Sequence, residues 1–292
     1  MARPVTFLDV FAERPLAGNG LAVVAGADGL ADEVMFAYAR ETKLSETTFV
    51  QAASDGGADY RNRIWTPGEE LPFAGHPSLG TAVAVARRRD QDEASLVQQT
   101  GAGLQAIEVR RERGPDAGGE LWRASMLQEP ASFGEELDPA AVMAAVGLEP
   151  ADAHPEVPPR IVSTGLAHVI APLTEPGALG RVVPDYPAVD ALISPLGAVT
   201  LYLSWFSPDG TARARAFSRI VEMGEDPATG SAAGPLCAYL AERGITEAMT
   251  ISQGAEMGRP STIEAAMDGE RVRVSGAVVP LLDGEIELPA SL

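Results

Sequence analysis

Two short segments of the chain share one pattern and lie 155 positions apart, at residues 73–77 and 228–232. Each segment combines glycine with polar residues, and each continues into a run of small and apolar residues, 78–86 and 233–241. Each therefore predicts a turn that opens into a helix of small residues.

Further segments repeat in the same order. Residues 61–66 match 213–218 in pattern, and residues 20–24 match 165–169. Three repeats in one order indicate a duplicated domain. Two halves that each carry a polar helix start can face one another across a cleft. Helix starts have free N–H groups and the positive end of the helix dipole, so such a cleft suits an anionic small molecule.

The composition is that of a globular protein, with 292 residues, 46% hydrophobic and 22% charged. This length is enough for two domains of ordinary size. The formal net charge of -19 argues against nucleic acid as a partner, because nucleic-acid binders show a basic stripe. No apolar run approaches the length that spans a membrane, so we expect no membrane partner either.

Cys237 is the only cysteine, so the chain can form neither an internal disulfide nor a cysteine-based metal cluster. Its apolar helical surroundings predict a buried structural thiol. The N-terminus shows no charged-then-apolar signal pattern. We therefore expect a cytoplasmic protein without a metal site.

Hydrophobic periodicity predicts many short strands and a few helices. The predicted helices cover residues 31–41, 76–89, 186–192 and 231–243. The fold class is α+β with two similar halves. The N-terminal half is expected to span residues 1–125, with 284–292 as a last strand that can return to complete it. The C-terminal half is expected to span 126–283.

Glu46 lies where a loop enters a predicted strand at residues 47–52. A carboxylate at this place can point along the sheet into a cleft and act as a general acid/base. That role calls for a partly buried carboxyl group whose pKa is raised toward neutrality. The alternative is a solvated surface glutamate.

His76 lies in the first turn of a predicted helix, between Gly75 and Pro77. Proline in a first turn supports a helix start there. A histidine at a helix start tends to be neutral, because the dipole disfavours its cation. It can exchange a hydrogen bond with a substrate or merely cap the helix, and the repeated pattern favours the substrate.

The second helix start carries Asp226, Thr229, Gly230 and Ser231. A turn of small residues that opens a helix can wrap an anion with its backbone N–H groups. Asp226 can orient His76 or bind a substrate ammonium group, and the two hydroxyl residues can donate to a carboxylate. The alternative is plain N-capping.

Segments 44–47, 70–77 and 226–235 together resemble the phenazine-biosynthesis isomerase family, the PhzF-like proteins. Residues 7–11, 253–254 and 258–261 also fit, and the matches lie in order along essentially the whole chain. The resemblance implies a diaminopimelate-epimerase-like fold. In that fold two pseudo-symmetric halves each wrap a barrel-like β-sheet around a central helix, with the active site in the cleft between them.

The resemblance also implies a homodimer and no cofactor. It gives Glu46 the position of the family's acid/base glutamate. His76, Asp226 and Ser231 take the positions that line the substrate site with it.

Related epimerases and racemases of this fold use two cysteines, one at each helix start. Ala74 and Thr229 stand at those positions here, and Cys237 lies well inside the second helix. Racemisation by two thiols is therefore excluded. A single carboxylate that takes a proton from one carbon and returns it to another remains.

We expect a cofactor-independent isomerase that acts on a small carboxylated metabolite, with an amino or hydroxy group as an optional feature. Glu46 moves the proton, and His76 and Asp226 position the substrate. The helix starts at Gly75 and Gly230 supply donors for its carboxylate.

Two alternatives remain open. Ser231, His76 and Asp226 are nominally a hydrolase set. The chain can also be a non-catalytic module of the same fold that binds a metabolite or a partner.

Overall fold

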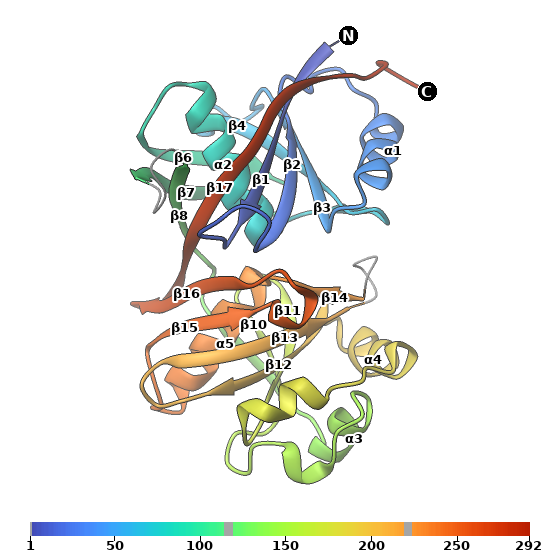
Figure 1. The fold of residues 1–292 in the computed structure, drawn as a ribbon, viewed down its shortest axis with the longest axis vertical. Helices are drawn as coiled ribbons and strands as arrows, with labels where there is room; N and C mark the ends of the chain where they lie inside the picture. The colour runs from blue at the N-terminus through green and yellow to red at the C-terminus, as the bar shows by residue number, and fades with distance from the viewer. Residues whose placement is uncertain (1, 114–118, 219–223) are drawn as a thin grey trace. The chain divides into compact units, whose positions relative to one another are not determined.

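The computed structural model describes residues 2–113, 119–218 and 224–292 (Figure 1). The chain divides into two compact units, Met1–Leu127 with Ser275–Leu292, and Gln128–Val274. None of the helices in the described ranges combines the length and the apolar character that a bilayer crossing requires.

The first unit is a sheet that closes around one helix. Its elements are β1 (Ala2–Val10), β2 (Asn19–Val24), α1 (Asp32–Thr42), β3 (Glu46–Gln51), β4 (Tyr60–Trp65), β5 (Glu70–Leu71), α2 (Gly75–Arg88), β6 (Glu93–Thr100), β7 (Gly103–Arg113), β8 (Glu120–Leu127) and most of β17 (Arg271–Glu287). The pairings run in a ring through β17, β1, β2, β3, β4, β6, β7 and β8 and back to β17. The strands therefore form a closed barrel.

Helix α2 is the core of this barrel. It contacts β1, β2, β3, β4, β6, β7 and β8, and its residues from Gly75 to Ala86 are buried. A helix that is apolar or small on all sides needs such an enclosure. The fit is tight at Gly80, where a Cβ atom would lie 2.6 Å from Leu21 and 2.8 Å from Val10. The small side chains of α2 thus let the strands approach the helix backbone.

The second unit also packs a sheet against one helix of small and apolar residues. Its elements are β9 (Ser132–Glu136), α3 (Pro139–Ala144), η1 (Pro150–Asp152), β10 (Arg160–Ser163), β11 (Ala167–Pro172), η2 (Pro176–Arg181), α4 (Tyr186–Ile193), η3 (Ser194–Leu196), β12 (Thr200–Phe206), β13 (Thr211–Phe217), β14 (Glu225–Asp226), α5 (Gly230–Glu242), β15 (Ala248–Gln253), η4 (Ala255–Met257), β16 (Ser261–Asp268) and the start of β17. Helix α5 packs on β10, β11, β15 and β16.

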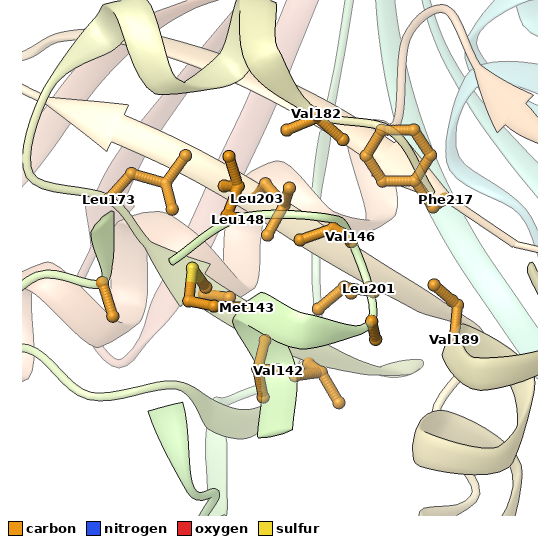
Figure 2. Close-up of a cluster of buried hydrophobic side chains, with 14 of the residues drawn as sticks. Val142, Met143, Val146, Leu148, Leu173, Val182, Val189, Leu201, Leu203 and Phe217 are labelled. Atoms are coloured by element: carbon orange, nitrogen blue, oxygen red, sulfur yellow. The ribbon is translucent and has the colours of Figure 1, made fainter. Parts of the chain in front are cut away.

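The other face of this second sheet carries a large apolar cluster (Figure 2). Leu201 and Leu203 of β12 point into it, and residues of α3, α4 and their loops cover it. Side chains alternate along a strand, so Tyr202 lies on the opposite face and turns toward the interior that holds α5. This alternation separates the apolar packing layer from the polar residues of the candidate site.

The duplication is visible in the strand pairing and in one ion pair. In the first unit β2 runs parallel to β3 and β4 parallel to β6; in the second, β11 runs parallel to β12 and β13 to β15. Arg63 of β4 donates two hydrogen bonds to Glu70 of β5, both 2.6 Å long. Arg215 of β13 holds Glu225 of β14 in the same forked way, at 2.7 and 2.8 Å.

The hydrophobic pattern of the sequence predicts two separate strands at 271–277 and 285–288, and strand β17 differs from this prediction. It is continuous from Arg271 to Glu287. The intervening segment contains Pro280, which cannot donate a ladder hydrogen bond, so the sequence there resembles a loop. The pairing with β1 shifts register at this place, since Phe7 pairs with Leu282 and Leu8 with Pro280. A β-bulge thus accommodates the proline inside the strand.

Candidate active site

Glu46 is the first residue of β3, level with Leu21 of the parallel strand β2. Its side chain is 12% exposed. Because β3 pairs in parallel with β2 from Glu46 onward, this carboxylate lies at the end of the barrel where β2 and β3 begin. The prediction of a solvated surface glutamate is therefore wrong, and that of a partly buried carboxylate is confirmed.

His76 is the second residue of α2 and is 5% exposed. Its Nε2 lies 3.3 Å from Oε2 of Glu46. Its Nδ1 lies 3.3 Å from the amide nitrogen of Asn19, the first residue of β2. The structure thus brings together Glu46 and His76, which lie 30 positions apart in the chain.

The environment of His76 sets its charge and its tautomer. Burial lowers the pKa of His76 to about 3, so the ring is neutral at physiological pH. An amide N–H of Asn19 can only donate, so Nδ1 accepts and the ring proton resides on Nε2. Nε2 lies beside Oε2 of Glu46, although the two atoms do not have the geometry of a hydrogen bond. The pair is a neutral donor beside a carboxyl group, with no cationic histidine.

Asn19 is a site residue that the sequence reasoning missed. It is buried and lies between two glycines, Gly18 and Gly20. Gly18 has a φ of +61°, and a Cβ atom there would lie 2.3 Å from the carbonyl oxygen of Val10. The sequence signal that could have identified Asn19 was a polar residue between two glycines at the start of a strand.

Asp226 and Thr229 form the centre of a buried cluster in the second unit. The Thr229 hydroxyl donates to Oδ2 of Asp226 at 2.6 Å. The Gln253 amide donates to the Asp226 carbonyl at 2.7 Å and to the Thr229 hydroxyl at 2.9 Å. Tyr202 donates to Oε1 of Gln253 at 3.1 Å. Gln253, known from the sequence only as part of a matching segment, links strand β15 to the helix start.

The helix starts are open in both units. Ala74 precedes α2 and Thr229 precedes α5, and no side chain caps either helix. The first N–H groups of a helix have no partner within the helix. The turns at Gly75 and Gly230 therefore present donors and a positive dipole end, as the repeated pattern predicts. Ser231, in the first turn of α5, is half-buried.

Neither a metal nor a reactive thiol is indicated in the described ranges. No group of three or more histidine, cysteine, aspartate or glutamate side chains there is arranged to hold a metal ion. Cys237 is buried inside α5, which confirms that prediction, and burial raises the pKa of its thiol to about 12.

A hydrolase assignment would need a carboxylate on Nδ1 of the histidine to stabilise its cation. In the structure Asn19 occupies that position at His76. Asp226 accepts from Thr229 instead. The contacts of these residues do not favour serine-directed hydrolysis.

The buried histidines predict an acid-sensitive fold. Burial lowers the pKa of His76 and of His168 to about 3, whereas an unfolded histidine titrates near 6.5. Between those values the unfolded chain binds more protons, so the free energy of unfolding falls as pH falls. We expect a loss on the order of 2–3 kcal/mol per histidine between pH 6.5 and 4.5.

Urea unfolding at pH 7.0 and at pH 4.5 measures this loss. His168 supplies the test variant because it lies far along the chain from Glu46. Its Nδ1 is hydrogen-bonded to the hydroxyl of Thr200 at 2.7 Å. His168→Gln should be less stable at pH 7 but lose less stability on acidification than the parent. Equal acid losses in the two proteins would contradict the prediction.

The chain matches the family described as phenazine biosynthesis-like protein over residues 8–284. It is 38% identical over 277 residues to the trans-2,3-dihydro-3-hydroxyanthranilate isomerase of Pseudomonas aeruginosa, covering 93% of each chain. Among solved structures it resembles a predicted epimerase from Pseudomonas aeruginosa, with a TM-score of 0.83 and 38% identity, covering 97% of this chain and 99% of the other.

A more distant likeness shows the fold alone. A hydroxyproline epimerase from Agrobacterium vitis is 14% identical, with a TM-score of 0.66, covering 98% of this chain and 91% of the other. The predicted α+β fold of the diaminopimelate-epimerase class, with two similar halves that each surround a helix, is confirmed.

Proposed function

The chain is an isomerase of the phenazine biosynthesis-like protein family, and from this premise we propose that Glu46 moves a proton within a small carboxylated metabolite without a cofactor. The observation that carries the proposal is the contact of Glu46 with a buried, neutral His76 at 3.3 Å. A carboxyl group beside a neutral N–H donor is suited to general acid/base catalysis.

The proposed step conserves the atoms of the substrate. The Glu46 carboxylate takes a proton from one carbon as that C–H bond breaks, and the electron pair moves into the conjugated system of the substrate. The proton on the glutamic acid exchanges with solvent, and the acid then delivers a proton to another carbon. The result is a 1,3-type shift or an enol-to-keto isomerisation. The Nε2–H of His76 donates to the oxygen on which charge develops, and Asn19 holds the ring in that tautomer.

The open helix starts are proposed to bind the substrate carboxylate. Gly75 and His76 begin α2, and Gly230 and Ser231 begin α5, in each case without a side-chain cap. Asp226 and Thr229 are proposed substrate-binding residues, and Gln253 and Tyr202 hold them in place. That both clusters act on one substrate stays a prediction.

The substrate class follows from the relative named above, whose printed name is that of a dihydro-hydroxyanthranilate isomerase. We propose a small carboxylate with an amino or hydroxy substituent. The absence of a thiol at Ala74 and Thr229 supports proton transfer by a carboxylate over the two-thiol chemistry of racemases.

Proton uptake from solvent tests the proposal directly. The protein is incubated in deuterated water with small amino and hydroxy carboxylates, dihydro-hydroxyanthranilate among them, and deuterium in each compound is followed by NMR. We expect deuterium at one carbon of a substrate with the parent protein and none with Glu46→Gln. Incorporation that persists in Glu46→Gln would refute the role of Glu46. Absence of incorporation with dihydro-hydroxyanthranilate would refute the proposed substrate class and favour the non-catalytic alternative.

We further propose a cytoplasmic homodimer. The resemblance to the family supports the dimer. The single buried thiol at Cys237 fits a reducing compartment. Both remain predictions.

A further inference from the structure

The first unit contains a cavity that the proposed chemistry does not use. Its volume is about 340 Å³, and it lies where α2 ends, beside Val85 and Arg88. None of the candidate site residues lines the cavity. Gly75 and His76 lie in the first turn of α2, at the opposite end of this 14-residue helix from Arg88. The volume falls at the lower end of the range for small-molecule sites, about 300–1,000 Å³.

The walls of the cavity are mostly apolar. Val23 of β2, Val50 of β3 and Val85 of α2 contribute to them. The walls thus come from several elements of one barrel, and they suit a compact apolar body.

Tyr60 is a buried polar residue of the cavity wall. It is 2% exposed, and its hydroxyl oxygen has no hydrogen-bond partner among the described residues. Burial raises the pKa of Tyr60, so the hydroxyl keeps its proton. A buried hydroxyl without a partner is unfavourable. Buried Tyr202 and Tyr239 show the usual arrangement, because each donates to an oxygen of the protein, Gln253 Oε1 and the Pro158 carbonyl.

Two of the charges around the cavity neutralise one another. Arg89 donates to Asp59 at 3.1 Å, and the second carboxylate oxygen of Asp59 accepts from the backbone of Val97 at 2.8 Å. This pair has little capacity left for a ligand.

Arg88 differs from Arg89 in this respect. It is exposed and lines the cavity, and it makes no hydrogen bond or ion pair with the part of the chain that the structure describes. Asp283 lies within electrostatic range of Arg88, but its carboxylate forms an ion pair with Arg87 at 3.0 Å. Asp28, also in the lining, accepts from the backbone of Ala52 at 2.9 Å. Arg88 is therefore the cation that an anionic ligand can recruit.

We propose that this cavity binds a small monocarboxylic acid with an apolar, ring-sized body and a hydroxy or oxo group, which accepts from Tyr60 while the carboxylate pairs with Arg88. The apolar body fills the space between Val23, Val50 and Val85. This site is independent of the proposed isomerisation, because it shares no residue with the candidate active site.

The probe is 4-hydroxybenzoate, titrated calorimetrically into the parent protein, with benzoate as the analogue that lacks the hydroxy group. Loss of one hydrogen bond corresponds to about a 3- to 10-fold weaker affinity. We expect benzoate to bind the parent protein more weakly than 4-hydroxybenzoate does, by this factor. Tyr60→Phe should bind 4-hydroxybenzoate more weakly than the parent by the same factor, and Arg88→Gln should bind both acids more weakly than the parent. Glu46→Gln should bind 4-hydroxybenzoate as the parent does, which separates this cavity from the active site.

Thermal unfolding without ligand distinguishes a ligand site from a structural hydroxyl. Tyr60→Phe should unfold at the parent's temperature or above it, because it removes an unsatisfied group. Tyr239→Phe, the matched control, should unfold at a lower temperature because it breaks a hydrogen bond of 2.9 Å. A drop for Tyr60→Phe equal to that of Tyr239→Phe would overturn the proposal. So would failure of 4-hydroxybenzoate to bind at millimolar concentration, or binding that neither Tyr60→Phe nor Arg88→Gln weakens.

Discussion

Glu46→Gln is expected to reduce kcat by about 10²- to 10⁴-fold, to the limit of detection, and to leave the fold intact. The amide keeps the shape of the side chain beside His76, at the 3.3 Å contact, but cannot accept and return a proton. Substrate binding should change little, because the donors at the helix starts remain. The measurements are steady-state turnover of dihydro-hydroxyanthranilate, calorimetric binding of the same compound and circular dichroism.

Two variants control this result. Glu41→Gln changes an exposed glutamate of α1 and should retain parental turnover. Glu46→Asp keeps a carboxylate but shortens the side chain by one methylene group, and should retain a small part of the activity. Turnover by Glu46→Gln at the level of Glu41→Gln would refute the assignment.

Gly254→Ala is expected to destabilise the protein by about 2–5 kcal/mol, the sum of left-handed backbone strain and overpacking. Gly254 has a φ of +76°, and a Cβ atom would lie 2.3 Å from the carbonyl oxygen of Arg259 and 2.5 Å from that of Pro227. Both are backbone atoms that cannot rotate away. Pro227 follows Asp226 directly, so the displacement should also disturb the cluster of Asp226 and Thr229.

Gly258 provides the matched control for this substitution in the same loop. Its φ is +70°, but nothing lies within 4 Å of the Cβ position. Gly258→Ala should therefore show only the strain, about 1–2 kcal/mol. Urea unfolding of both variants measures the difference. Equal losses would mean that the close approach at Gly254 has no energetic consequence.

Local sequence patterns were sufficient to predict the central elements of the fold. Small residues in an unbroken run predicted helices at 76–89 and 231–243, and the structure has them at Gly75–Arg88 and Gly230–Glu242. The glycines of residues 100–103, between two runs typical of strands, likewise predict a hairpin turn, and the turn there joins β6 to β7. The continuity of β17 was not predictable, because Pro280 is tolerated only through a register shift against β1, a distant strand.

The candidate site divides in the same way. Glu46 and His76 were identified through their motifs, and in the structure their side chains lie 3.3 Å apart. Asn19 and Gln253 were missed as partners, since each acts through a hydrogen bond set by strand register and not by local sequence. The roles proposed for Asp226, Thr229, Gly230 and Ser231 stay predictions that the exchange experiment and variants address.

The course of β17 has a consequence for biosynthesis on the ribosome. Residues 275–287 close the first barrel, yet they are translated only after residues 128–274, which emerge as one contiguous segment. Until then the nascent N-terminal unit exposes the open edges of β1 and β8, which can pair with other chains. Domains generally mature from the N-terminus during synthesis. Here residues 128–274 of the second unit are complete first, and the first unit must wait until residues 275–287 emerge.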